Sequence, residues 1–212
     1  ARADRVAVVG YTRSPAFGGQ TGTAPYKKNQ ANFSNNTDIF MSVVKPKVSP
    51  ADRWQHDYII WYGSDGEDFS SKIGFDPQGN VIFTGSTYES SFPVTDGTTY
   101  KFLDDGVIVK FTPTATRAWA SIYGTTAIDD VMDLAIDGTG AAIVVGYCPI
   151  NGFPTTTPIK GTLTGASDGF IRKFNANGTI AFSTYYGGDS IDQIYGCAVD
   201  AANNIWVVRL TG

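Results

Sequence analysis

Short runs of β-branched and aromatic residues, separated by Gly, Asn and Asp, recur along the whole chain. Runs of about four to eight such residues between turn-forming residues are typical of strands joined by tight turns. The stretch Asp168–Gly212 shows the pattern most clearly, with apolar runs at 170–174, 179–186, 195–199 and 205–210. No run approaches the roughly 18 uninterrupted apolar residues of a membrane-spanning helix. The pattern predicts an all-β chain that does not span a membrane.

The predicted strands fall into a repeat of four, which we name strands A to D. Strand A ends in Asp before a Gly- or Asn-containing turn, as hairpins commonly do, at Lys72–Asp76, Asp133–Asp137 and Gly196–Asp200. Strand B carries a Gly near its end in three copies and Arg209 at that place in the fourth: Arg5–Thr12, Val81–Thr87, Ala142–Cys148 and Ile205–Leu210. Strand C begins with Asp at Asp38–Val44, Asp105–Phe111 and Asp168–Phe174. Strand D ends in Gly at Tyr58–Gly63, Ala118–Gly124 and Ala181–Gly187.

Tandem four-stranded units predict a β-propeller, because small twisted sheets of this kind repeat around an axis. We expect a partial blade B-C-D over 5–63, full blades over 72–124 and 131–187, and a partial blade A-B over 195–212. The first unit is enlarged by the loop Arg13–Thr37 and by an expanded turn at Lys45–Asp57. About three blades fall short of a ring. The chain is therefore expected to be a segment of a larger propeller, completed by further blades or by protein partners.

Combined motifs carry a resemblance to a known family. The sequence reads YGCAVD then IWVV in its last unit, FPTT in the preceding loop, and DGFIRKF-NANG-TIAFSTYYGG between them. These segments resemble the bacterial SBBP family of β-propeller repeats, and the resemblance covers most of the chain. It implies a secreted or cell-surface location outside a bacterial cell. The family has no common catalytic set, so the resemblance supplies no active-site residue.

Composition narrows the chemistry. The net charge of −4 and a pI near 4.9 exclude the basic stripe expected of a nucleic-acid surface. A single His, His56, and two cysteines without CxxC spacing argue against a zinc site. Acidic links at 64–68, 128–130 and 189–192 could hold Ca²⁺, although Asp accepting backbone N–H bonds in a turn is the favoured interpretation. We expect no catalytic residue, no bound metal and no cofactor, with Ca²⁺ as the alternative.

Cys148 and Cys197 are placed at the same end of adjacent predicted blades. A disulfide between them would suit an oxidising compartment. Cys197 also stands where the sister repeats have Leu134 and Ile73, so it could equally be a buried apolar residue. Both alternatives stay open at this point.

The aromatic residues fall into two groups, one expected to pack between blades and one expected to contact a partner or ligand. Those on strand D and Trp206 on strand B are expected to fill the space between blades. Tyr26, Tyr88 and Tyr100 lie in predicted loops, and we expect them to be contacts for a partner or ligand. The sequence favours a non-enzymatic structural or protein-interaction module of a cell-surface protein or assembly. The alternative is a lectin-like or adhesin propeller that binds carbohydrate, and a hydrolase propeller is the third hypothesis.

Overall fold

The computed structural model describes residues 4–14, 36–46 and 54–212, and every regular element in them is a strand. The described residues contain no helix that is long and apolar enough to cross a membrane. The thirteen strands are β1 (Val6–Thr12), β2 (Asp38–Pro46), β3 (Trp54–Tyr62), β4 (Asp68–Phe75), β5 (Val81–Thr87), β6 (Asp105–Phe111), β7 (Arg117–Tyr123), β8 (Asp130–Ile136), β9 (Ala142–Cys148), β10 (Asp168–Phe174), β11 (Ile180–Tyr186), β12 (Asp192–Val199) and β13 (Ile205–Thr211). The prediction of an all-β chain with these strands is confirmed.

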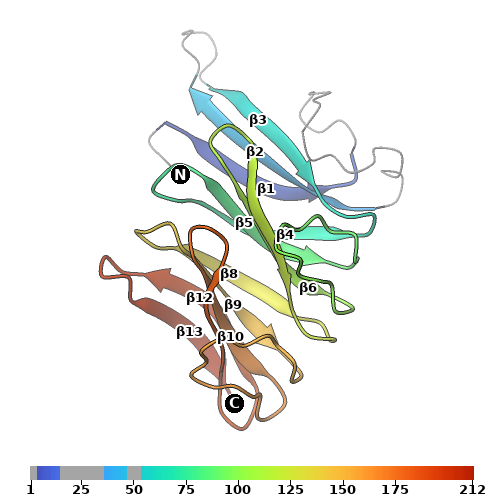
Figure 1. The fold of residues 1–212 in the computed structure, drawn as a ribbon, viewed down its shortest axis with the longest axis vertical. Coiled ribbons are helices and arrows are strands. Elements are labelled where there is room, and N and C mark those ends of the chain that lie inside the picture. The colour runs from blue at the N-terminus through green and yellow to red at the C-terminus, as the bar shows by residue number, and fades with distance from the viewer. Residues whose placement is uncertain (1–3, 15–35, 47–53) are drawn as a thin grey trace.

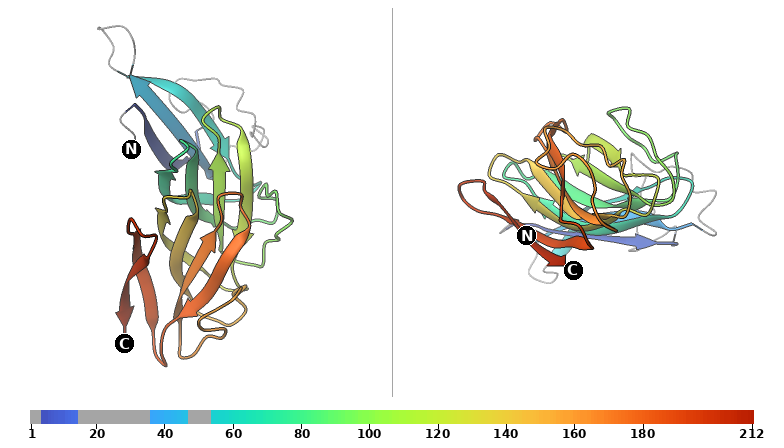
Figure 2. Two further views of the ribbon diagram at one scale, coloured as in Figure 1. Left: turned by 60° about the vertical axis from the view of Figure 1, so that its left-hand side comes forward. Right: turned by 90° about the horizontal axis from the view of Figure 1, so that it is seen from below.

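The strands form four antiparallel sheets in which chain neighbours pair with one another. The first sheet is β1-β2-β3, the second β4-β5-β6-β7, the third β8-β9-β10-β11 and the fourth β12-β13. The sheets follow one another along the long axis of the molecule, from the blue strands to the red ones (Figures 1 and 2). The arrangement is the one predicted, with three, four, four and two strands.

Some strand boundaries differ from the prediction. Strand A begins at Asp68, Asp130 and Asp192, several residues earlier than the sequence pattern indicates. Each of these strands contains a bulge, after Ser70, Val131 and Ile194, and a bulge interrupts the alternation on which the prediction rests. β3 also begins early, at Trp54, so His56 lies in a strand and not in the predicted turn, and its Nδ1 is 2.9 Å from Ser42 Oγ.

Three apolar clusters fill the spaces between successive sheets. The first joins the first and second sheets and contains Ile39, Ile60 and Phe83. The second joins the second and third sheets, and the third joins the third and fourth. Both middle sheets are therefore buried on both faces. Their central strands carry apolar residues at successive positions because neither face meets water.

Two glycines stand opposite the bulges because no side chain fits there. A Cβ on Gly85 would overlap the carbonyl oxygen of Phe69, and a Cβ on Gly146 would overlap that of Asp130. Arg209 occupies the matching position of β13, opposite Ile194. The Gly near the end of strand B is therefore a packing requirement in the second and third sheets.

A single main-chain hydrogen bond recurs where each sheet meets the next. The N–H groups of Asp68, Asp129 and Asp192 donate to the carbonyl oxygens of Thr37, Asp104 and Ser167 at 2.7, 3.1 and 2.9 Å. Each of these bonds joins the start of strand A to the residue next to strand C of the preceding sheet. The same contact thus links all four sheets.

The loops that contain FPVT at 92–95 and FPTT at 153–156 cover the outer strands of the second and third sheets. Thr95 N–H donates to Ala120 O at 3.0 Å, and Thr156 exchanges two main-chain bonds with Ser183 at 2.9 Å. An outer strand with unpaired backbone groups is an open template for another chain, and these loops close it. The motif that carries the family resemblance therefore has a structural purpose.

In each middle sheet an ion pair joins strand C to the end of strand A. Lys110 Nζ lies 2.8 Å from Asp76 Oδ2, and Lys173 Nζ lies 2.7 Å from Asp137 Oδ2. Each Asp ends strand A and each Lys belongs to strand C, so the pair spans strand B. The ammonium groups neutralise carboxylates that have lost contact with water.

Candidate functional site

A groove separates the outer strand of the second sheet from the β10–β11 turn. It has a volume of about 500 Å³ and is bounded by residues 95, 96 and 98 of the β5–β6 loop, 118–120 of β7, and 177–180 of the turn. The three segments are distant in the sequence. They meet because the second and third sheets pack against each other through the second apolar cluster. We call this feature the β7 groove.

The polar side chains of the β7 groove are held by their own turns. Asp96 Oδ1 accepts from the N–H and hydroxyl of Thr98 at 3.0 and 2.6 Å. Asn177 Oδ1 accepts from the N–H and hydroxyl of Thr179 at 3.1 and 2.7 Å. These bonds use one oxygen of each side chain, so Asp96 Oδ2 and the Asn177 amide N–H groups keep their hydrogen-bonding capacity.

The apolar part of the groove is rigid. Trp119 is 6% exposed and stacks on Phe174, with ring centroids 5.7 Å apart. Its Nε1 donates to Ala176 O at 3.1 Å, and a Cβ on Gly178 would lie 2.7 Å from the indole ring. Trp119 therefore packs between the sheets, as expected for strand D aromatics, and fixes the turn that carries Asn177. The groove combines a fixed apolar wall with one carboxylate, one amide and hydroxyl groups.

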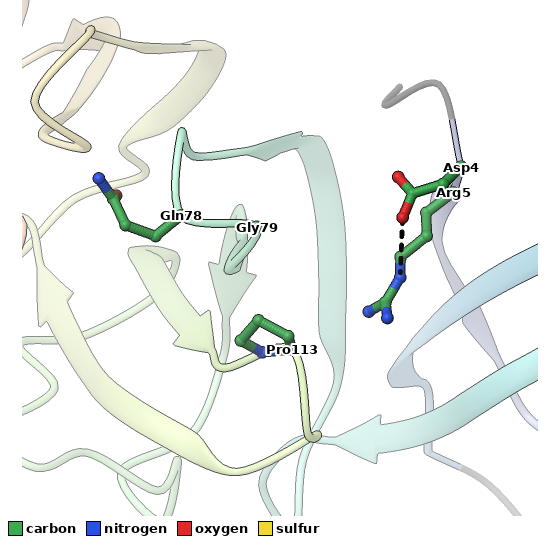
Figure 3. Close-up of a pocket in the computed structure, with 5 residues that line it drawn as sticks. All are labelled: Asp4, Arg5, Gln78, Gly79 and Pro113. Carbon is green, nitrogen blue, oxygen red and sulfur yellow. Dashed lines mark ion pairs between the residues drawn. The ribbon is translucent and has the colours of Figure 1, made fainter.

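A second, smaller hollow lies near the start of β1. It has a volume of about 130 Å³ and is bounded by Asp4, Arg5, Gln78, Gly79 and Pro113. Asp4 and Arg5 lie on one side of it, and Gln78, Gly79 and Pro113 lie on the other (Figure 3). Arg5 Nη1 is 3.2 Å from Asp57 Oδ2 and Nε is 3.8 Å from Asp4 Oδ2. These two carboxylates neutralise the charge of Arg5, so the hollow has little free charge with which to bind a ligand.

Pairs of buried aspartates face each other where successive sheets meet. In the second pair, a Cβ on Gly124 would clash with Asp105 Oδ1 and lie 2.9 Å from Asp129 Oδ2. The first pair is Asp38 with Asp68 around Gly63, and the third is Asp168 with Asp192 around Gly187. Asp68, Asp129 and Asp192 each accept the N–H of the residue four positions earlier, at 2.5, 2.5 and 2.6 Å. The acidic links are thus built as turn-closing acceptors.

The third pair is in ion-pair contact with basic side chains, whereas the second pair has only the more distant charge of Lys101 beside Asp105. Lys160 Nζ is 2.8 Å from Asp168 Oδ2, and Arg209 Nη1 is 3.2 Å from Asp192 Oδ1. Burial raises the pKa of Asp105 to about 6 and that of Asp129 to about 7. The N–H and the charge of Lys101 act against this rise at Asp105, and the N–H and hydroxyl of Thr125 act against it at Asp129. In contrast, the N–H of Gly188 is the main cause that lowers the pKa of Asp192. Equivalent positions therefore differ in their expected protonation near neutral pH.

No group of three or more His, Cys, Asp or Glu side chains within the described ranges is placed to hold a metal ion. Ca²⁺ binding at the acidic links stays a prediction. Ca²⁺ takes roughly six to eight oxygen ligands, so a site there would have to include backbone carbonyl oxygens as well as carboxylates.

Two of the three tyrosines predicted as ligand contacts, Tyr88 and Tyr100, belong to the described residues. Tyr26 lies outside the described residues. Tyr88 is 43% exposed and packs edge-on against Phe69, with ring centroids 5.9 Å apart. Tyr100 donates its hydroxyl to Leu103 O at 2.6 Å. Neither Tyr88 nor Tyr100 lines the β7 groove.

The two cysteines are free thiols in the structure. Cys148 belongs to the cluster between the second and third sheets, whereas Cys197 packs against the cluster between the third and fourth. Opposite faces of the third sheet therefore separate them. The predicted alternative of a disulfide is not formed, and Cys197 is a partly buried apolar contact.

Comparison with known proteins finds a likeness to solved structures but no family. No family model matches the chain, and no curated protein matches it. A solved structure described as a "putative gluconolactonase" is similar at 17% identity with a TM-score of 0.36. The similarity covers 80% of this chain and 53% of that protein, so the chain spans about half of its length. The resemblance to SBBP repeats stays a prediction.

This finding corrects the functional prediction. The sequence favoured a non-enzymatic structural module, but the similar structure is described as an enzyme, so the class can no longer be given as non-catalytic. At this TM-score the likeness assigns no activity to the chain. The prediction rested on the lack of a recognisable catalytic motif, and this lack does not exclude catalysis by side chains from distant segments.

Proposed function

We propose that the four sheets are blades of a β-propeller, two of them complete. Three features support this: the repeated strand order, the bulge at the same place in each strand A, and the repeated hydrogen bond between successive sheets. The SBBP repeat type, a secreted or cell-surface location in bacteria, and completion by further blades or protein partners are part of the same proposal. They rest on the repeat pattern of the sequence.

We propose that the β7 groove binds a small, neutral, polyhydroxylated molecule of the sugar class. The observation that carries this proposal is the free hydrogen-bonding capacity of Asp96 Oδ2 and the Asn177 amide beside an apolar wall. Carboxylate and amide groups bind vicinal hydroxyls, and an apolar wall suits the C–H face of a sugar ring. The negative charge of Asp96 disfavours sugar acids. A preformed, rigid site of this kind loses little conformational entropy on binding.

Hydrolysis of the bound molecule is the second candidate function, because Asp96 is the one titratable group that lines the groove within the described residues. A carboxylate with a free oxygen can act as a general base toward water. Lactones and glycosides of neutral sugars are the substrate classes that fit this chemistry.

To test the groove, the protein is titrated with a panel of neutral saccharides and sugar lactones while its ¹H–¹⁵N NMR spectrum is recorded. We expect shifts confined to residues 95–98, 118–120 and 177–180. Asp96→Ala and Asn177→Ala should each weaken binding by about tenfold or more, because each removes hydrogen bonds to the ligand. Asp189→Ala, at an exposed site outside the groove, should bind like the unaltered protein.

The same titration reports hydrolysis when the signals of substrate and product are followed over time. Turnover that Asp96→Ala abolishes would support the second candidate. Turnover that survives this change would place the reaction elsewhere, and ligand shifts outside the three segments would refute the groove itself.

A further inference from the structure

Four apolar side chains are exposed around the junction between the second and third sheets. Phe102 and Leu103, near the end of the β5–β6 loop, are 61% and 42% exposed. Ile128, in the link before β8, is 49% exposed, and Tyr88, just after β5, is 43% exposed. We call these four residues the junction patch. Each of the two sheets packs against a neighbouring sheet on both faces, so the patch is bounded by described sheets on every side of the junction.

Hydrogen bonds hold the members of the junction patch together. The N–H of Asp129 donates to Asp104 O at 3.1 Å, which brings the residue after Ile128 against the residue after Leu103. The hydroxyl of Tyr88 is hydrogen-bonded to the Asp104 side chain. The patch is therefore one surface, although its residues come from three segments of the chain.

The third sheet has small residues at the matching place. The main-chain bond that ends at Asp104 O in the second sheet ends at Ser167 O in the third. In both sheets, the N–H four positions before the Asp that begins strand C also donates to that Asp side chain. These bonds align Phe102-Leu103-Asp104 with Gly165-Ala166-Ser167. The shape of the loop end therefore does not require large side chains.

The backbone of the junction patch is strained. Leu103 has a φ of 63°, in the left-handed region that favours glycine, and the matching turn of the third sheet has Gly165 with a φ of 78°. The Tyr100 hydroxyl holds this conformation by donating to Leu103 O at 2.6 Å. Strained residues of this kind cluster at binding sites. Because smaller residues would relieve the strain, it points to a role for the exposed side chains themselves.

Two carboxylates beside the junction patch have no cation in contact with them. Asp104 is buried and its Oδ1 has no hydrogen-bond partner, whereas Asp130 is half-buried. Burial raises the pKa of Asp104 to about 6; the hydroxyls of Ser86 and Tyr88 act against this rise, and the charge of Asp130 adds to it. Among the described residues, neither carboxylate is within ion-pair distance of a Lys or Arg side chain. Apolar area and unbalanced negative charge thus adjoin each other.

We propose that the junction patch binds a segment of a partner protein in which an Arg adjoins a Leu, Ile, Val or Met. The guanidinium stacks on Tyr88 and pairs with Asp130, and the charge of Asp104 lies behind it. The adjoining apolar side chain covers Leu103 and Phe102. Arg is preferred to Lys because its planar, weakly hydrated group can stack on a ring and pair with a carboxylate at once. None of these residues lines the β7 groove, so the two sites are independent.

The first test is a selection of phage-displayed random dodecapeptides on the full chain at pH 8, where Asp104 is charged. The counter-selection uses the triple variant Phe102→Gly, Leu103→Ala and Asp104→Ser, which has the residues of the third sheet at this place. Because the third sheet already folds with these residues, the variant should fold, and its urea midpoint should not fall. We expect the peptides that survive to contain Arg next to Leu, Ile, Val or Met.

The second test uses one selected peptide made synthetically. It should shift the ¹H–¹⁵N NMR signals of residues 88, 102–104 and 128–130. Replacing its Arg by citrulline, which has a similar shape and no charge, should weaken binding about tenfold or more. Asp130→Asn in the protein should weaken binding to a similar degree. Asp189→Asn, an exposed carboxylate at the next junction, is the matched control and should bind the peptide like the unaltered protein.

Four outcomes would overturn the proposal: no peptide survives the counter-selection, the survivors lack Arg, the citrulline peptide binds equally well, or the shifted signals lie outside the junction patch. Concentration-dependent dimers of the unaltered protein that the triple variant abolishes would show that a second copy is the occupant, and would also overturn it. If the triple variant does not fold, Asp130→Asn takes its place in the counter-selection, and the same outcomes decide.

Discussion

Gly146→Ala should unfold at a much lower urea concentration than the unaltered protein. The new methyl group would overlap the carbonyl oxygen of Asp130 and lie 2.9 Å from the ring of Phe170. Neither neighbour can yield, because the carbonyl belongs to a paired strand and Phe170 is fully buried. We expect a loss of roughly 2–4 kcal/mol in the free energy of unfolding, which is at the upper end for overpacking. Gly85→Ala should behave in the same way.

Gly161→Ala is the matched control. Its Cβ would meet Pro158 Cγ at 3.7 Å, an ordinary contact, and the residue is exposed. The free energy of unfolding should change by less than about 0.5 kcal/mol. Urea unfolding followed by far-UV circular dichroism measures all three variants. If Gly146→Ala were as stable as Gly161→Ala, the bulge opposite Gly146 would not have the geometry described.

The protein should be more stable at pH 5 than at pH 8. Burial raises the folded-state pKa of Asp105 to about 6 and that of Asp129 to about 7, above the ordinary value of 3.8. The folded state therefore holds protons that the unfolded state has released. Stability from this source is fully present below about pH 4 and is lost as the pH rises through 6 and 7. We expect a difference of about 2–4 kcal/mol between pH 5 and pH 8.

A pair of matched variants isolates the effect. Asp129→Asn removes a charge that burial disfavours, so it should stabilise the protein at pH 8 and flatten the pH dependence. Asp192→Asn removes a carboxylate that Gly188 N–H and Arg209 favour in its charged form, so it should destabilise the protein at pH 8. The measurement is the urea midpoint of each variant and of the unaltered protein at pH 5 and at pH 8. Destabilisation by Asp129→Asn at pH 8 would show that the folded state favours the charged form of Asp129, which contradicts a raised pKa.

Addition of Ca²⁺ at pH 8 extends the same measurement. Added Ca²⁺ should raise the urea midpoint only if the acidic links bind the ion, because a ligand that binds the folded state alone stabilises that state. Asp129→Asn would then lose that gain, whereas an unchanged urea midpoint would count against Ca²⁺ at this pair.

The strands were predictable because their ends are marked by residues with a local role. Asp76 and Asp137 close turns through hydrogen bonds to nearby N–H groups, and such bonds depend on the neighbouring sequence alone. The early starts of β4, β8 and β12 were not predictable in this way. Each follows from a bulge, and a bulge is stabilised by the partner strand and not by the residues that form it.

The candidate site was largely invisible in the sequence. Asp96 and Asn177 are 81 positions apart, and only the packing of Trp119 against Phe174 brings their turns together. The sequence analysis recognised Asp105 only as the first residue of a strand C and Asp129 only as part of an acidic link. Their pairing around Gly124 depends on how two sheets meet, which local patterns do not encode. The difference between this pair and Asp168–Asp192 comes from Lys160 and Arg209, which lie in other segments.

The repeated hydrogen bond from the start of strand A to the preceding sheet makes the chain modular, because each sheet is joined to the next in the same way. The second and third sheets each present this donor to the preceding sheet and this acceptor to the following one, so duplication of one such unit creates a junction that already has both partners. An array built by such duplications can lengthen or shorten by whole units without a new kind of contact. Its stability then changes in steps, one interface at a time, as in other repeat proteins.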